Sequence, residues 1–300
     1  MTIDIHTHFF DRKAHWGPQV EADCENCGMP LESWEFTSQQ HLDATAAVDY
    51  AVVFGLRGAK TGWNIPNDVV AAQVAKAPHR LIFFTSIDPT EPDFMDQLAY
   101  THTHLNAKGV KISPIYQGLH PHDPRYYQVF EYCQRHGLPV LTHMATTFSS
   151  GVPLDWARPA HMDKVAIDFP GLNIIMAHLG HPWEGEAIAA MRKQKNIFCD
   201  LSALYYRPWQ FYNSMRLAVE YKATGKILFG SDYPATTPAG TLEALRNMNS
   251  VLGSSSLPPV PLQIIEEIIH RDSLAMLGID MPEKFSAVSH NHTGEHQNHD

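Results

Sequence analysis

Residues 109–143 contain a complete strand–helix–strand pattern, GVKISPIYQGLHPHDPRYYQVFEYCQRHGLPVLTH. The apolar run Gly109–Ile112 predicts a strand. Asp123-Pro124 predicts the start of a helix, because aspartate caps a helix and proline suits its first turn, and Gly137 predicts where that helix ends. The apolar run Pro139–His143 predicts the next strand. Two apolar strands joined by a helix indicate a parallel sheet covered by helices.

The same alternation extends over most of the chain. The other predicted strands are Thr2–Thr7, Tyr50–Phe54, Leu81–Ile87, Leu172–His178, Ile197–Leu201 and Lys226–Gly230, and a last helix is predicted over Leu262–Leu277. Eight strand–helix units in 300 residues predict an α/β fold of the closed (β/α)₈ type, a TIM barrel. An open, doubly wound sheet is the alternative. It favours a glycine-rich turn after the first strand, where this chain has His6-Thr7-His8-Phe9.

The composition excludes several classes of protein. Hydrophobic residues make up 44% of the chain and charged residues 18%, which is typical of a globular protein. The net charge of −10 disfavours binding to nucleic acid or to an anionic membrane, and no apolar run reaches the ~18 residues of a transmembrane helix. The chain begins with a strand pattern instead of a signal peptide, and its four cysteines fit reduced thiols, so we expect a cytoplasmic protein.

Metal-binding and titratable side chains stand at the ends of five predicted strands. They are His6, His8, Lys111, His143, His178 and Asp232. A barrel brings the carboxyl ends of all its strands to one mouth, so we expect these side chains to face each other. A single His-x-His motif means little in a chain with 19 histidines. The ordered set at strand ends predicts a metal site, in which the alternation of a strand points His6 and His8 the same way.

The sequence around these residues resembles a known family. The stretches Gly109–Pro114, Gly137–His143, Ala177–Trp183 and Leu228–Pro234, together with His6-x-His8, are similar to the metal-site pattern of the amidohydrolase superfamily. The residues that flank the ligand positions in these stretches resemble the amidohydrolase-related branch of the superfamily. This branch contains aminocarboxymuconate-semialdehyde decarboxylase-like proteins and many metal-dependent hydrolases. The resemblance covers residues 2–280, and it implies a single barrel domain over residues 1–280.

This resemblance implies one divalent ion or two, with Zn²⁺ the expected metal. His6, His8, His143 and Asp232 would hold it, and Asp232 would also carry the proton of an activated water. His178 would polarise the substrate carbonyl or bind a second metal. Lys111 would either be carboxylated and bridge two metals or remain a free ammonium that binds substrate. Decarboxylases of the branch mostly lack this lysine, so its presence favours a hydrolase.

The resemblance leaves three functions open. The first is hydrolysis of an amide, ester, lactone or thioester of a small, carboxylated substrate. The second is non-oxidative decarboxylation of an aromatic or enoic acid, and the third is a catalytically inactive barrel that serves as a binding module. Arg57 and Arg207 are candidates for binding a substrate carboxylate, and the alternative for each is a salt bridge within a loop. Trp183 is a candidate for lining the pocket, and its alternative is ordinary packing within a loop. The expected partner is a small molecule, and a homodimer is compatible with the sequence.

Two segments exceed what a barrel needs. Residues 281–300 form a polar, histidine-rich tail that we predict to be disordered. The long first loop, residues 9–41, contains two tryptophans and the pair Cys24 and Cys27. Because loops of this length are usually functional or disordered and this one is rich in apolar residues, we predict a lid that brings Trp16 or Trp34 to the site. Packing on the barrel's flank or a dimer contact is the alternative.

Overall fold

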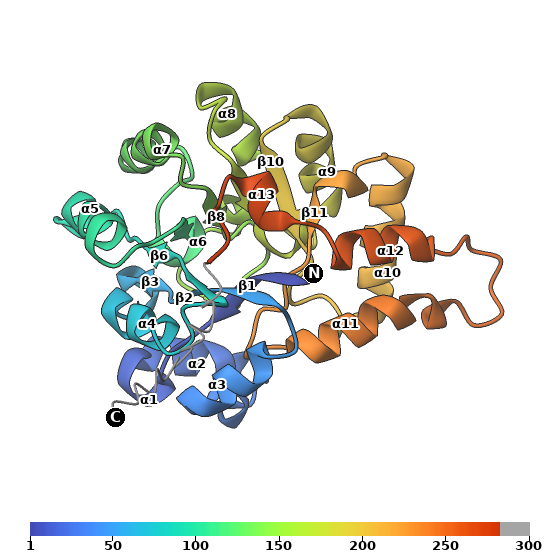
Figure 1. The fold of residues 1–300 in the computed structure, drawn as a ribbon, viewed down its shortest axis with the longest axis horizontal. Coiled ribbons are helices and arrows are strands. Elements are labelled where there is room, and N and C mark those ends of the chain that lie inside the picture. Colours follow the sequence, from blue (N-terminus) through green and yellow to red (C-terminus); the bar gives the residue numbers. More distant parts are fainter. Residues whose placement is uncertain (283–300) are drawn as a thin grey trace, which may run out of the picture.

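The computed structural model describes residues 1–282 as an α/β barrel with its strands in the centre and its helices around them (Figure 1). All eight predicted strands are present, which confirms the predicted fold class. The barrel strands are β1 (Ile3–His8), β2 (Tyr50–Phe54), β5 and β6 (Leu81–Phe83 and Thr85–Ser86), β7 (Val110–Ile112), β8 (Val140–Thr142), β9 (Ile174–Met176), β10 (Ile197–Asp200) and β11 (Ile227–Leu228).

The strands pair in parallel and form a closed ring. One sheet has the order β1-β2-β5 and the other β11-β10-β9-β8-β7-β6, and β5 and β6 are one strand interrupted at Phe84. Hydrogen bonds also join β1 to the chain at β11. The amide of Ile5 donates to the carbonyl of Phe229 (3.1 Å), and the amide of Asp232 donates to the carbonyl of His6 (2.7 Å). Asp232 is thereby placed directly beside the strand that contains His6 and His8.

Helices follow the strands, and most of them cover the outside of the ring (Figure 1). They are α4 (Asn67–Val74), α5 (Phe94–His104), α6 (Pro114–Gln117), α7 (Pro124–His136), α8 (His161–Asp168), α9 (Glu184–Lys193), α10 (Pro208–Glu220), α11 (Pro238–Asn247), α12 (Leu262–Ile269) and α13 (Ser273–Leu277). The predicted limits of α7 are confirmed, since Asp123 caps its first turn and Gly137 ends it with a φ of 67°. None of the helices in residues 1–282 is both long and apolar enough to cross a bilayer.

The core has two parts. One lies between the strands and the helices, and the other fills the barrel interior with side chains such as Ile5, Phe54, Phe84 and Leu141. Leu274 of α13 packs against the interior cluster, so this helix closes one end of the barrel. The catalytic mouth predicted from the sequence lies at the other end, where the strands finish.

The structure departs from the sequence-based expectations in two places. The predicted last helix is two helices, because the chain turns after His270 and the side chain of Asp272 caps α13 by accepting from the amide of Ala275. The first loop contains the helices α1 (Arg12–His15) and α2 (Pro18–Asn26) and a 3₁₀ turn at Leu31–Trp34, and α3 (Ser38–Thr45) begins at its end. The prediction for the tail lies outside the described residues, apart from its first two positions.

Candidate metal centre

A β-bulge in β1 sets the direction of His6. The pairing of β1 with β2 shifts register between Asp4 and Thr7, so strict alternation does not hold along this strand. Ile5 packs in the barrel interior, and the ring of the next residue, His6, still lies 5.2 Å from that of His8. Bulges next to active sites commonly redirect a side chain in this way. The carboxylate of Asp4, two residues earlier, accepts from the amides of His6 and Ser231, both at 3.0 Å.

The ligand atoms of His6, His8 and Asp232 converge on one point. The Nε2 atoms of both histidines lie 3.1 Å from the same oxygen, Oδ1 of Asp232. The contact of His6 is not a hydrogen bond in its geometry, so this buried nitrogen is left without a hydrogen-bond partner. Asp232 also has a φ of 71°, in the left-handed region that non-glycine residues rarely adopt. Such strain is typical of a residue that the fold holds in place for its function.

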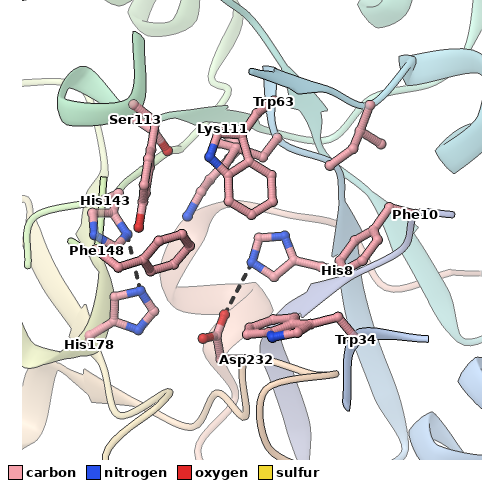
Figure 2. Close-up of a pocket in the computed structure, with 13 residues that line it drawn as sticks. His8, Phe10, Trp34, Trp63, Lys111, Ser113, His143, Phe148, His178 and Asp232 are labelled. Atoms are coloured by element: carbon pink, nitrogen blue, oxygen red, sulfur yellow. Dashed lines mark hydrogen bonds and ion pairs between the residues drawn. The ribbon is translucent and has the colours of Figure 1, made fainter. Parts of the chain in front are cut away.

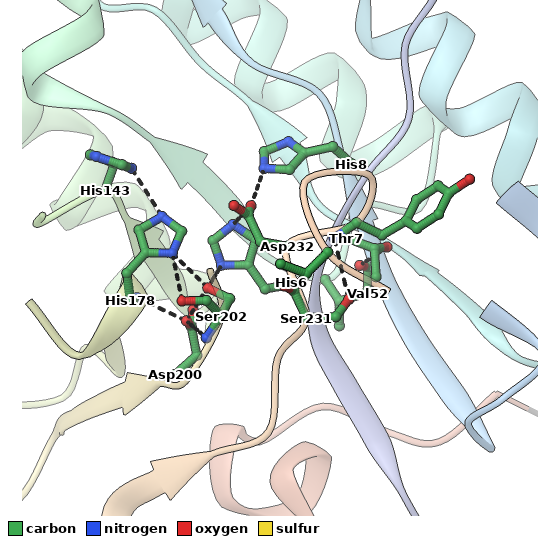
Figure 3. A network of polar contacts seen from close by, with 12 residues as sticks. His6, Thr7, His8, Val52, His143, His178, Asp200, Ser202, Ser231 and Asp232 are labelled. Atoms are coloured by element: carbon green, nitrogen blue, oxygen red, sulfur yellow. Dashed lines mark hydrogen bonds and ion pairs between the residues drawn. The ribbon is translucent and has the colours of Figure 1, made fainter. Parts of the chain in front are cut away.

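Asp200, at the end of β10, fixes the tautomer of His6 (Figure 3). Its Oδ2 lies 2.8 Å from Nδ1 of His6, and its Oδ1 accepts from the amides of His178 (2.9 Å) and Ser202 (3.0 Å). The hydroxyl of Ser202 donates to the same carboxylate. A carboxylate can only accept, so His6 carries its proton on Nδ1 and presents the lone pair of Nε2 to Asp232. Ligand histidines in metal sites are usually oriented by a carboxylate in this manner.

His143 and His178 present two further lone pairs. Nε2 of His143 lies 3.0 Å from the carbonyl of Thr146, and Nδ1 of His178 lies 2.7 Å from the Ser202 hydroxyl, whose proton already goes to Asp200. Both of these nitrogens must therefore donate. The other two nitrogens, Nδ1 of His143 and Nε2 of His178, face each other at 3.2 Å. In neutral rings these two atoms are both acceptors, and they repel unless a cation lies between them.

The electrostatics favour neutral rings for His8 and His143 beside an ionised Asp232. Burial lowers the pKa of His8 to about 4 and that of His143 to about 3. Burial alone would raise the pKa of Asp232, but the adjacent charge of His6 and the close contacts of its carboxylate with the rings of His6 and His8 hold it well below its usual value. For His6, burial is outweighed by the charges of Asp200 and Asp232, and its pKa is raised. A cation on Nε2 of His6 is therefore favoured, and this donor set fits Zn²⁺, for which two nitrogen ligands at about 2.0–2.1 Å lie about 3.3 Å apart.

Lys111 supplies a buried positive charge in the same pocket. It is only 2% exposed, and its ammonium lies 4.8 Å from the centre of the Phe54 ring. Burial lowers its pKa to about 8. Among the described residues no carboxylate lies within salt-bridge distance of this ammonium. Lys111 is therefore free to bind an anion that enters the pocket.

The site lies between two connected cavities. The inner chamber has a volume of about 80 Å³ and is mostly apolar; its walls include Phe10, Trp34, Trp63 and Phe148, with Lys111 at one side (Figure 2). The outer chamber has a volume of about 520 Å³. Six residues line both chambers: Trp34, Tyr116, His143, Phe148, His178 and Asp232. A substrate that reaches the metal-binding residues therefore has apolar walls on one side and a wider, more polar opening on the other.

The remaining predicted residues are placed differently. Arg207 lines the outer chamber, with its guanidinium 4.4 Å from the centre of the Tyr206 ring. Arg57 pairs with Glu91, and Trp183 packs against the core beside α9, so neither lines a chamber. In the first loop, Trp34 lines both chambers and Trp16 packs on it with ring centres 5.6 Å apart. Whether this loop acts as a lid remains a prediction.

Three residues of the site were not predicted from the sequence: Asp200, Ser202 and Tyr116. Asp200 stands at the carboxyl end of a correctly predicted strand, so the rule that selected the histidines also applied to it. Tyr116 lies in α6, directly after β7, and packs on the ring of His143 with centres 4.9 Å apart. No short sequence motif identifies Asp200 or Tyr116 as a site residue.

The family model for amidohydrolases matches residues 3–279, which is nearly the whole of the described chain. The chain belongs to the amidohydrolase family. It is thus an enzyme of the amidohydrolase superfamily, which confirms what the resemblance implied. A search of curated proteins gave no significant match.

Solved structures of the same fold include proteins of several kinds. An uncharacterised TIM-barrel protein from Bordetella bronchiseptica has 20% sequence identity and a TM-score of 0.69, over 92% of this chain and 99% of that one. A dihydroxybenzoic acid decarboxylase from Polaromonas with bound manganese has 13% identity and a TM-score of 0.63, over 92% of this chain and 96% of that one. An amidohydrolase from Burkholderia multivorans with bound zinc has 11% identity and a TM-score of 0.64, over 93% of this chain and 100% of that one. At these identities the likeness establishes the fold.

Proposed function

We propose that this amidohydrolase-family enzyme uses a divalent ion, Zn²⁺ in the first instance, to hydrolyse an amide, ester, lactone or thioester of a small carboxylated substrate. The convergence of Nε2 of His6, Nε2 of His8 and Oδ1 of Asp232 carries the proposal. His143 would complete the ligand set, with His178 beside it. The zinc and manganese in the two metal-bound relatives support a divalent ion at this mouth.

The residues around the ion would divide the chemistry between them. When bound, the ion would supply two effects: it lowers the pKa of its water to near neutral, and it polarises the carbonyl group of the substrate. The ionised carboxylate of Asp232 would accept the proton of that water and pass it to the leaving group. His178 would serve as a further metal ligand through the lone pair of Nε2, since its Nδ1 carries the ring proton. Asp200 would keep His6 in the tautomer that binds the metal.

Two positive charges indicate that the substrate is an acid. Lys111 lines the inner chamber and Arg207 the outer one, and the metal-binding residues His143, His178 and Asp232 line both. Each can bind a carboxylate, Lys111 as a point charge and Arg207 as a bidentate fork. The apolar walls of the inner chamber would exclude water and strengthen the contact with Lys111. Arg57 is the weaker candidate because Glu91 already neutralises it.

Decarboxylation of an aromatic or enoic acid is the second candidate. The aromatic walls of the inner chamber suit a planar substrate, and the relative from Polaromonas is a decarboxylase. Lys111 favours hydrolysis, because the resemblance described above associates decarboxylases of this branch with the lack of a lysine at this position. The convergence of His6, His8 and Asp232 argues against an inactive binding module.

A substrate screen with two readouts tests the proposal. The full chain, loaded with zinc or with manganese, would be incubated with carboxylated lactones, aryl esters and amides and with hydroxylated benzoic acids. We expect acid release from the first group, no release of carbon dioxide, and loss of activity with a chelator that zinc restores. Carbon dioxide release in step with substrate loss would establish decarboxylation instead. Hydrolysis that persists unchanged after metal removal would refute the metal-dependent mechanism.

Replacing Lys111 by methionine is expected to stabilise the protein and impair substrate binding. Methionine has a similar length and no charge, so it removes the cost of holding an ammonium in an apolar chamber. We expect the free energy of unfolding to rise by about 1–3 kcal/mol, measured by urea denaturation of the metal-free protein, and KM to rise at least about tenfold.

Lys108→Met, at a partly buried lysine outside both chambers, is the control for the denaturation experiment. An unchanged KM in Lys111→Met would show that Lys111 does not bind the substrate. A loss of bound metal in that variant would instead support a carboxylated lysine that is itself a ligand.

A further inference from the structure

A second group of histidines lies outside the catalytic mouth. His120 and His122 are in the segment between α6 and α7, and His161 is the first residue of α8. The three rings are mutual neighbours, with centres 5.0 Å (His120 to His122), 4.8 Å (His120 to His161) and 5.3 Å (His122 to His161) apart. All three are partly buried, and none lines either chamber.

Two of the rings are held in a tautomer that suits metal binding. Nε2 of His122 lies 2.8 Å from the carbonyl of His161, and Nε2 of His161 lies 3.0 Å from the carbonyl of Asp155 and 3.3 Å from its carboxylate. These partners accept hydrogen bonds, so both Nε2 atoms donate and both Nδ1 atoms keep a lone pair. Histidines that bind metals usually donate their second ring nitrogen to a carbonyl or carboxylate in the same way.

The third ring is less well prepared. Nδ1 of His120 accepts from the amide of His122 at 3.1 Å, so a metal must displace this bond or bind after the ring has turned. Burial and the two neighbouring histidines lower the pKa of His120, which keeps its ring neutral and able to bind a metal near pH 7. One ligand atom from each residue lies within 4.8 Å of the other two, so small side-chain movements bring all three to one ion.

We propose that His120, His122 and His161 form a transition-metal site, separate from the catalytic centre, that binds Zn²⁺ or another ion that prefers imidazole. Three imidazole nitrogens supply three of the four ligands that zinc takes in proteins. The adjacent carboxylate of Asp155 adds negative charge beside the site through its contact with His161. Oxygen-preferring ions such as Mg²⁺ and Ca²⁺ do not fit this donor set.

Such a site would join two loops of the catalytic face. The segment from His143 to Ala160 connects β8 to α8, contributes Thr146, Thr147 and Phe148 to the outer chamber, and ends beside His161. The other side of the site lies just before α7. A bound ion would therefore hold the end of a pocket-lining loop against its neighbour and stabilise the folded state over the unfolded one.

Zinc titration of the full chain tests this site by calorimetry and by thermal unfolding. The variants are His122→Gln, His161→Gln and His120→Gln, and His79→Gln removes one exposed histidine as the matched control. We expect His122→Gln and His161→Gln to bind one equivalent of zinc fewer than the parent. His120→Gln should lower the affinity by a smaller factor. The control should bind as the parent does, and all five proteins contain the same catalytic residues and the same tail.

The thermal readout separates a metal site from a structural role of the histidines. Zinc should raise the unfolding temperature of His122→Gln and His161→Gln by less than it raises that of the parent and of His79→Gln. Without zinc, all variants should unfold within a few degrees of the parent. Equal zinc stoichiometry in the parent, His122→Gln and His161→Gln, with affinities within about twofold, would overturn the proposal. Loss of the equivalent in His79→Gln as well would do the same.

Discussion

Replacing Asp232 by asparagine is expected to lower kcat/KM by at least about 1,000-fold while the fold stays intact. Asp232 has two roles in the proposed site, as a metal ligand and as the group that accepts the proton of the water. An amide is a weaker ligand and offers no base. The backbone should tolerate the change, because asparagine is one of the residues that accept the left-handed conformation seen here, with a φ of 71°.

Three measurements check this prediction: kcat/KM on the substrate found by the screen, metal content, and thermal unfolding. The backbone amide of residue 232 donates to the carbonyl of His6 at 2.7 Å in the parent, and the substitution leaves this amide unchanged, so the barrel closure should survive. Activity within about tenfold of the parent, which corresponds to only about 1.4 kcal/mol of activation free energy, would contradict both roles. An inactive variant that no longer unfolds cooperatively would not count as support.

Replacing Asp200 by asparagine is expected to weaken metal binding by about 10–100-fold, although Asp200 contacts no metal in the proposed site. The carboxylate now accepts from Nδ1 of His6. If the amide nitrogen of asparagine takes that place, it donates to Nδ1, and the proton of the ring moves to Nε2. That change removes the lone pair that His6 presents beside Asp232.

Competition with a chromophoric chelator measures this affinity directly and requires no substrate. Ser202→Ala is the matched control, because it removes a hydroxyl from the same network and leaves the contact of Asp200 with His6 in place. We expect the control to change the affinity by no more than about threefold, because the carbonyl of residue 202 still accepts from His178. Equal losses in the two variants would indicate a general loosening of the network and not a role in fixing the tautomer.

Much of the fold was predictable from the sequence because its signals are local. Apolar runs such as Gly109–Ile112 form buried parallel strands, and Asp123 and Gly137 limit α7 through contacts within a few residues. The last helix was predicted as one because the apolar spacing continues past His270. The cap formed by Asp272 divides it, and a capping contact competes with helix continuation in a way that periodicity does not reveal.

The candidate metal ligands were also predictable, because a barrel collects the carboxyl ends of its strands at one mouth. A residue at the end of a predicted strand can therefore be expected at the mouth. This rule grouped His6, His8, His143 and Asp232 before any contact between them was known. The same rule applied to Asp200, but a lone aspartate after a strand has no distinguishing motif, and its contact with His6 spans 194 residues.

The tertiary structure alone decided how these side chains are used. The register shift in β1 is a property of its pairing with β2, and the tautomer of His6 depends on a carboxylate from β10. Likewise, Glu91 neutralises Arg57, whereas Arg207 reaches the outer chamber, although both follow strands in the sequence. The sequence determined which residue types gather at the mouth, since strand order and chain direction suffice for that. Their directions, protonation and partners depend on contacts between distant segments, which exist only once the barrel has closed.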